Sequence, residues 1–138
     1  MMRNNTIRSY LIHVLIPFLS GIILYLLGRS LVSLQVNKLL KLNYAPPPLN
    51  LPEWLIFNVP DGLWLYSFLM WLILIWQHEK GIEPFVWYGF LILGAIGSEF
   101  MQKFSVIQGT YDSNDIYAYF LTILLCAKNY YQLNMITQ

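Results

Sequence analysis

Charged residues are scarce in this chain. Of its 138 residues, 11% are Asp, Glu, Lys or Arg, which is less than half the roughly 25% found in ordinary soluble domains. Hydrophobic residues make up 57% of the chain and aromatic residues 17%, so the composition predicts an integral membrane protein. The net charge is only +1, and the eight basic residues are scattered singly. No basic surface for nucleic acid is therefore expected.

Residues that commonly carry chemistry are also few. The single cysteine, Cys126, excludes an internal disulfide and a cysteine metal site, and its apolar surroundings predict a small packing residue. His13 and His78 are predicted on the side of the membrane away from the acids, where they pack helices or mark the interface. The sequence has no G-x-S-x-G, H-E-x-x-H or phosphate-binding glycine loop. We expect no metal and no cofactor, and the lack of a nucleophile paired with a base argues against an enzyme.

Four apolar segments approach the ~20 residues that cross a ~30 Å hydrocarbon core. They predict a single all-α membrane domain with four transmembrane helices at about residues 9–28, 61–76, 84–104 and 113–131. The first follows Arg3 and Arg8 as a signal peptide would, but its apolar run is long and no A-x-A site follows, so an uncleaved anchor is expected. Pro17 should bend this helix. The helix at 61–76 is expected to be short, because about 15 apolar residues rise roughly 22 Å.

The connection between the first two spans has its own pattern. Residues 29–42 predict an amphipathic helix, which either lies in the membrane interface or continues the first helix into water. Consecutive prolines at 46–48 then end helical structure within a proline-rich loop, residues 43–60, because proline lacks a donor. Trp54 lies in an apolar piece of this loop that is too short to cross, which indicates an interfacial or re-entrant turn.

The third predicted helix carries small residues at helical spacing. Gly94, Ala95, Gly97 and Ser98 form overlapping small-xxx-small pairs, which let another helix backbone approach closely. Glu99 lies one turn beyond Ala95. The sequence therefore predicts an acid beside the closest helix contact of the bundle.

Acids collect at the helix ends on one side of the predicted membrane domain. Asp61 begins the second helix, and Glu99 lies near the end of the third. Asp112 is predicted to cap the fourth helix, with Asp115 at the third helical position, where a carboxylate is also favourable. The seam of the fourth helix that faces away from lipid is predicted as Asp115, Ala118, Tyr119, Thr122 and Cys126.

These acids have two interpretations. Helix capping explains Asp112 and Asp115 without any ligand, whereas Glu99 opposes the helix dipole at a C-terminus and no cap explains it. Acids at membrane depth usually face a wet cavity and have a function, and an unpaired one takes up a proton or finds a cation. The functional interpretation is a polar cup that binds a headgroup, a sugar or a lipid-linked intermediate. Its candidate residues are Arg29, Asp61, Glu99, Gln102, Lys103, Asp112, Asp115 and Tyr119.

The order of these motifs resembles the VanZ-like family of small four-helix bacterial membrane proteins. The resemblance covers Pro60 to about Thr122 and consists of an acid at the start of the second span, then Glu99-x-x-Gln102, then Gly109-Thr110-Tyr111-Asp112-x-x-Asp115. It implies a role in the cell envelope, where the founding member is associated with resistance to the glycopeptide teicoplanin. The resemblance brings Asp61, Glu99, Gln102 and Asp115 into the site.

The chain also departs from this family pattern. Gly62 stands where many members have Lys, and no His follows in the second helix. Thr110 or Tyr111 stands at the place of a frequent Arg, and Tyr119 at the place of a frequent Asn. The chain therefore lacks the Lys, His and Arg side chains that many family members carry at these positions, and a role that needs them is not expected here.

Three functions from different classes remain open. The preferred one is a non-catalytic envelope protein that binds or shields a lipid or a lipid-linked cell-wall component at the acidic cup. The runner-up is a membrane-embedded enzyme with Glu99 and Asp115 or Asp61 as acid and base, and the third a small structural subunit of a larger complex or a homo-oligomer. Membrane lipids are the expected partners, in a bacterial inner membrane. Four spans would put both termini on one side of the membrane. The two sides carry equal numbers of Lys and Arg residues, so the positive-inside rule does not decide the orientation, and we predict cytoplasmic termini.

Overall fold

The computed structural model describes residues 2–41, 51–79 and 81–136, with side chains except those of residues 2–5, 30–34 and 134–136. Over these residues the chain is helical and has no strand, so the predicted all-α class is confirmed. The helices in order are α1 (Met2–Tyr10), the π-helical turn η1 (Leu11–Leu15), α2 (Ile16–Gly28), α3 (Ser30–Leu40), α4 (Glu53–Phe57), α5 (Val59–Ile75), α6 (Glu83–Lys103) and α7 (Ser113–Ile136).

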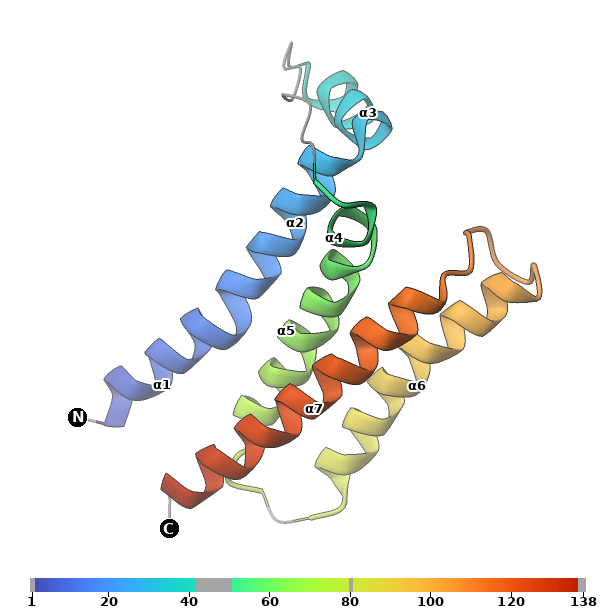
Figure 1. Ribbon diagram of the computed structural model, residues 1–138. Helices are drawn as coiled ribbons and strands as arrows, with labels where there is room; N and C mark the ends of the chain where they lie inside the picture. Colours follow the sequence, from blue (N-terminus) through green and yellow to red (C-terminus); the bar gives the residue numbers. More distant parts are fainter. Residues whose placement is uncertain (1, 42–50, 80, 137–138) are drawn as a thin grey trace.

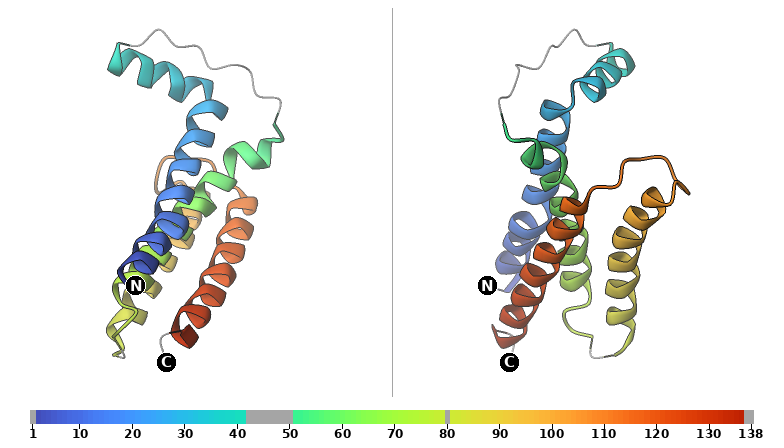
Figure 2. Two further views of the ribbon diagram at one scale, coloured as in Figure 1. Left: turned by 90° about the vertical axis from the view of Figure 1, so that its left-hand side faces the viewer. Right: turned by 45° about the vertical axis from the view of Figure 1, so that its right-hand side comes forward.

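The helices form an antiparallel bundle whose two termini lie at the same end, as Figures 1 and 2 show. One rod is made by α1, η1 and α2, and the others are α5, α6 and α7. We call the end with the termini the terminal end, and the end with α3, α4 and the α6–α7 loop the cup end. Among the described residues, three helical stretches are long and apolar enough to cross a membrane: Thr6–Gly28, Glu53–Ile75 and Glu83–Lys103.

The first rod is continuous but not uniform. It begins at Met2, seven residues before the start expected from the apolar run. Pro17 lies in the first turn of α2, and because proline has no backbone N–H it cannot donate to the preceding turn. Directly before it, Leu11–Leu15 are wound as a π-helical turn in which the N–H of Ile16 donates to the carbonyl of Leu11. The structure thus shows a local rewinding of the helix before Pro17, and the bend expected from this proline stays a prediction.

Helix α3 leaves the bundle at Arg29. This residue is extended (φ −108°, ψ 95°) and separates α2 from α3, so the helix predicted for residues 29–42 spans Ser30–Leu40 and turns away from the rod (Figure 1). It ends at Lys41, which has a left-handed backbone (φ 53°). Residues 42–50, which include the three consecutive prolines of the predicted loop, lie outside the described residues.

The structure corrects the interpretation of residues 51–60 as a turn. Glu53–Phe57 form α4, and α5 begins at Val59 rather than at the predicted residue 61. Pro60 cannot donate to the turn before it, so the helix is interrupted at Asn58 and α4 lies at an angle to α5 (Figure 2). Helix α5 alone has 17 residues, and together with α4 and Asn58 it belongs to a stretch of 23 residues that is apolar enough to cross a membrane.

Helix α5 is the centre of the bundle. Leu65, Leu69, Met70 and Ile73 of this helix form a buried cluster with Tyr119 and Cys126 of α7. The predicted seam of α7 is confirmed in that Asp115, Tyr119, Thr122 and Cys126 are all buried.

The closest helix contact is not where the small residues of α6 predicted it. A Cβ added at Gly94 or Gly97 would meet nothing within 4 Å. The tightest approaches at a glycine are those of α2, where a Cβ on Gly21 would collide with Trp64 of α5 at 2.6 Å and one on Gly28 would collide with Ile56 of α4. A further close contact joins α5 to α7: a Cβ on Gly62 would be 3.3 Å from that of Ala118, and the hydroxyl of Thr122 donates to the carbonyl of Gly62 at 2.9 Å. The prediction was wrong because small residues permit a close approach but do not choose the partner.

Candidate functional site

A cavity of about 550 Å³ opens at the cup end of the bundle, within the ~300–1,000 Å³ range of small-molecule sites. Each of the four rods, or a segment joined to it, contributes to its wall. The lining residues are Arg29, Phe57, Asn58, Asp61, Glu99, Gln102, Gly109, Thr110, Asp112 and Asp115. We call this cavity the acidic cup. Six of the eight residues predicted from the sequence line it.

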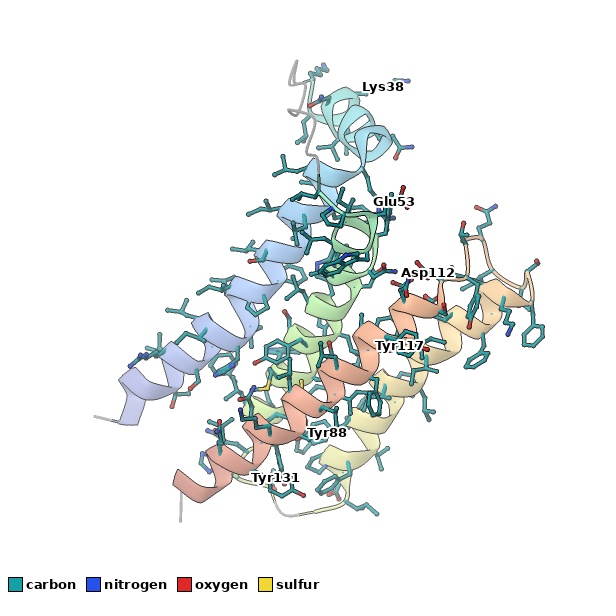
Figure 3. The ribbon with its side chains drawn as sticks, in the orientation of Figure 1. Lys38, Glu53, Tyr88, Asp112, Tyr117 and Tyr131 are labelled. Atoms are coloured by element: carbon teal, nitrogen blue, oxygen red, sulfur yellow. The ribbon has the colours of Figure 1, made fainter. Side chains whose placement is uncertain are left out.

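Asp112 and Asp115 are held by the start of α7. Asp112 precedes the first helical residue, and its Oδ1 accepts the backbone N–H of Asn114 at 2.9 Å, so the predicted N-cap is confirmed. Asp115 lies at the third helical position, as expected. Figure 3 shows Asp112 at the beginning of α7, toward the end of the bundle that carries α4 and Glu53. The capping interpretation is therefore correct for Asp112, but capping uses only one of its oxygens.

Asn58 connects these two acids and was not among the residues predicted from the sequence. Its Nδ2 donates to Asp112 Oδ2 and to Asp115 Oδ1, both at 2.8 Å, and the residue is 5% exposed. The hydrogen bond from Asn58 is the main cause that lowers the pKa of Asp112, with the Asn114 backbone N–H adding to it. The available signal was a lone amide, two residues before Pro60, in an otherwise apolar piece. Its position at the helix interruption is what directs it to α7.

Glu99 is the most unusual group in the cup. It is 4% exposed, and its Oε2 is buried without a hydrogen-bond partner among the described residues. The backbone amide of Asp112 is directed at the same carboxyl group, and Asp115 and Asp61 lie within electrostatic range of it. Leaving a buried acceptor unsatisfied costs ~1–3 kcal/mol and more when it is charged. A donor from a ligand would satisfy it.

Arg29 is the one cation among the residues that line the cup. Its guanidinium lies over the rings of Tyr25 at 4.3 Å and Phe57 at 5.2 Å, and its Nη2 donates to the carbonyl of Phe57 at 3.5 Å. The lining also holds four carboxylates, so the cup carries a formal excess of three negative charges when all these groups are ionised. The site thus favours a ligand that brings positive charge or several hydrogen-bond donors.

The remaining predicted residues lie elsewhere. Lys103 is exposed, and its ammonium lies 5.0 Å from the centre of the Tyr111 ring, outside the cup. Tyr119 is buried below the cup, beside Asp61. Gly109 was quoted only as part of a motif, but it has φ 149° and lies against the side chain of Gln102, so a side chain there would be strained and would collide.

The terminal end holds a separate polar contact. Tyr66 accepts a hydrogen bond from Asn129 Nδ2 at 2.8 Å, and its hydroxyl lies 2.7 Å from His13 Nδ1. His13 therefore packs the first rod against α5, as the sequence predicted. Within the described part of the chain, no three His, Cys, Asp or Glu side chains are grouped closely enough to hold a metal ion.

Comparisons of the chain with protein-family models, with curated proteins and with solved structures found no match. The resemblance to the VanZ-like family therefore rests on the quoted residues alone. The geometry and charge of the cup are what bear on the function.

Proposed function

We propose that this chain is a four-span membrane protein of the bacterial cell envelope that binds, and thereby shields, the polar part of a lipid or a lipid-linked cell-wall component in the acidic cup. The observation that carries the proposal is the position of the cup. It is a cavity with four carboxylates at one end of a bundle whose long helices are apolar enough for a membrane. Acids at such a depth are costly unless they have a function.

The fourth span is part of this proposal. Helix α7 has 24 residues, or ~36 Å at 1.5 Å per residue, runs antiparallel to α6 and packs along α5. Four spans with cytoplasmic termini in the inner membrane would place the cup on the outer side, and α3 would lie near the interface there. Membership of the VanZ-like family belongs to the same proposal.

Topology is tested by labelling single cysteines in a Cys126→Ala background. Ile7→Cys and Gln132→Cys are at the terminal end and Ser113→Cys is at the cup end, and all three native side chains are exposed. A membrane-impermeant thiol reagent applied to intact cells should label Ser113→Cys alone. Labelling of all three from the same side would contradict the four-span arrangement.

Ligand binding is tested with Glu99→Gln, which keeps the shape of the side chain and removes its charge. Glu53→Gln, an exposed carboxylate at the same end, is the matched control. Lipid that copurifies with the protein in mild detergent would be identified by native mass spectrometry. Loss of a charged hydrogen bond predicts that lipid occupancy falls at least about tenfold in Glu99→Gln. Occupancy should be unchanged in Glu53→Gln. Equal occupancy in all three proteins would refute the proposal.

The enzyme alternative is favoured by one observation, the electrostatic proximity of Glu99, Asp61 and Asp115. Two carboxylates in such proximity can act as acid and base. The same purified proteins distinguish it, since turnover of a lipid-linked precursor that is abolished in Glu99→Gln would replace the binding function by catalysis. A single stoichiometric protein partner would favour the subunit alternative.

A further inference from the structure

A smaller cavity, of about 290 Å³, adjoins the acidic cup. It is a groove between α5 and α6 with Tyr119 of α7 at its base, and its wall is mostly apolar, with Asp61 as the one charged residue of the lining. Asp61 lines both the groove and the cup. The two cavities therefore share one wall residue, where the carboxylate lining of the cup meets a hydrocarbon surface. We call the smaller cavity the α5–α6 groove.

The groove exists because α6 presents small residues to it. Gly94 and Ala95 line the groove on the α6 side, and nothing in the described structure lies within 4 Å of a Cβ added at Gly94. Large apolar side chains, Phe68 of α5 and Phe90 of α6, form its rim and are 45% and 72% exposed. From Asp61 to Phe68 the groove follows α5 for about two turns, or ~10 Å. It thus has the size and polarity for part of an alkyl chain.

From this continuity we propose that the ligand is a lipid with a primary amine in its head, which lies in the acidic cup, and with a hydrocarbon chain in the α5–α6 groove. This inference rests on the proposed binding function and specifies its ligand. The amine is assigned because the ionised lining carries an excess of three negative charges and because Glu99 Oε2 has no donor among the described residues. An ammonium group has three N–H donors and no acceptor, so it matches a site that is rich in acceptors.

The chain position follows from the place of Asp61. A head that contacts Asp61 and Glu99 at the floor of the cup leaves its chain at the entrance of the groove, and the exposed rim lets the chain reach there sideways from the bilayer. A chain that enters from the bilayer exchanges lipid hydrocarbon for the groove wall, so the groove contributes packing contacts and a fixed chain position instead of transfer from water. A soluble amine without a chain would lack these contacts.

The test uses the purified full-length chain in phosphatidylcholine nanodiscs, with empty nanodiscs as the partition blank. The probes are dodecylamine, dodecanol with the same chain and no charge, and ethanolamine with an amine and no chain. Saturable binding of dodecylamine is expected, with each of the other two at least about tenfold weaker. Dodecanol that binds as tightly as dodecylamine would overturn the amine, and ethanolamine that does so would overturn the chain.

Two matched glycine variants test the groove. Gly94→Leu places a side chain in the groove, whereas Gly97→Leu places the same side chain on α6 outside it, and neither Cβ has a neighbour within 4 Å. Gly94→Leu should weaken dodecylamine binding about tenfold or more, because the leucine side chain would occupy the space of the alkyl chain, while Gly97→Leu leaves binding unchanged. If Glu99→Gln abolishes binding and Gly94→Leu does not, the groove is wrong and the cup stands. If Glu99→Gln binds dodecylamine like the native chain, the cup itself is wrong.

A measurement without any variant covers the case in which Gly94→Leu does not fold. Dodecylamine with a diazirine in the middle of its chain is photolysed in the native protein, and the adduct is mapped by peptide mass spectrometry. Adducts on α5 and α6 between Trp64 and Phe68 and between Phe90 and Ala95 are expected. The proposal would be overturned by adducts confined to the terminal end. It would also be overturned by adducts that are spread evenly over the bundle and that excess dodecanol suppresses to the same extent at every position.

Discussion

The hydrogen bonds of Asn58 make the sharpest stability prediction. One bond, to Asp115, is buried, and the other, to Asp112, is half-buried; both measure 2.8 Å. Hydrogen bonds to charged groups contribute ~1.5–3 kcal/mol when buried, and the more exposed one is discounted to about 1 kcal/mol or less. Asn58→Ala also leaves two neighbouring carboxylates without their common donor. We expect it to lower the free energy of unfolding by ~2–4 kcal/mol.

The assay is reversible unfolding of the purified protein in mixed micelles, read by near-ultraviolet circular dichroism. Asn129→Ala is the matched control, because the amide of Asn129 donates one hydrogen bond of 2.8 Å to the neutral hydroxyl of Tyr66, which predicts a cost of ~0.5–1.5 kcal/mol. A double-mutant cycle should show stronger coupling of Asn58 with Asp115 than with Asp112. An Asn58→Ala cost no greater than that of Asn129→Ala, or no coupling to Asp115, would refute the reasoning.

Two further predictions concern packing and pH. Gly62→Leu should lower the free energy of unfolding by about 1–3 kcal/mol through overpacking, because Ala118 and Thr122 fill the space beside Gly62. Gly97→Ala should be neutral or stabilising by up to ~1 kcal/mol. Thermal unfolding of both proteins measures the two effects, and equal effects would contradict the placement of the α5–α7 contact. Because the native pKa of Asp112 is below its ordinary value of 3.8, its contribution is fully present above that value and is lost as the pH falls through the lower native pKa. Asp112→Asn should remove this part of the acid dependence of stability, and an unchanged acid profile would refute the role of the Asn58 and Asn114 contacts.

The acids of the cup show how far local rules reach. Capping preference placed Asp112 and Asp115 correctly at the start of α7, since a cap depends only on the residues of one helix turn. Helical periodicity likewise predicted the buried seam with Tyr119, Thr122 and Cys126. Glu99 was selected as a functional candidate because neither capping nor the helix dipole explained an acid at the C-terminal end of an apolar helix. Its burial and its unpartnered oxygen among the described residues agree with that interpretation.

The partners of these residues were decided by the tertiary structure. Asn58 joins α5 to α7 across 57 residues of sequence. Its orientation follows from the interruption that Pro60 imposes between α4 and α5, and hydrophobic periodicity does not predict this interruption. Arg29 lines the cup and Lys103 does not, because the Arg29 guanidinium lies over the ring of Phe57, whereas the Lys103 ammonium lies over the ring of Tyr111.

The same division holds for the bundle as a whole. Composition and apolar run length alone determined an all-α protein suited to a membrane, because backbone polar groups in hydrocarbon must be satisfied within each helix. Which faces meet is a different matter, since in lipid helix pairing depends on the shape match of two surfaces and not on the hydrophobicity of either one. Gly62 therefore has its partner in α7, while Gly94, with an equally permissive sequence around it, borders an open groove.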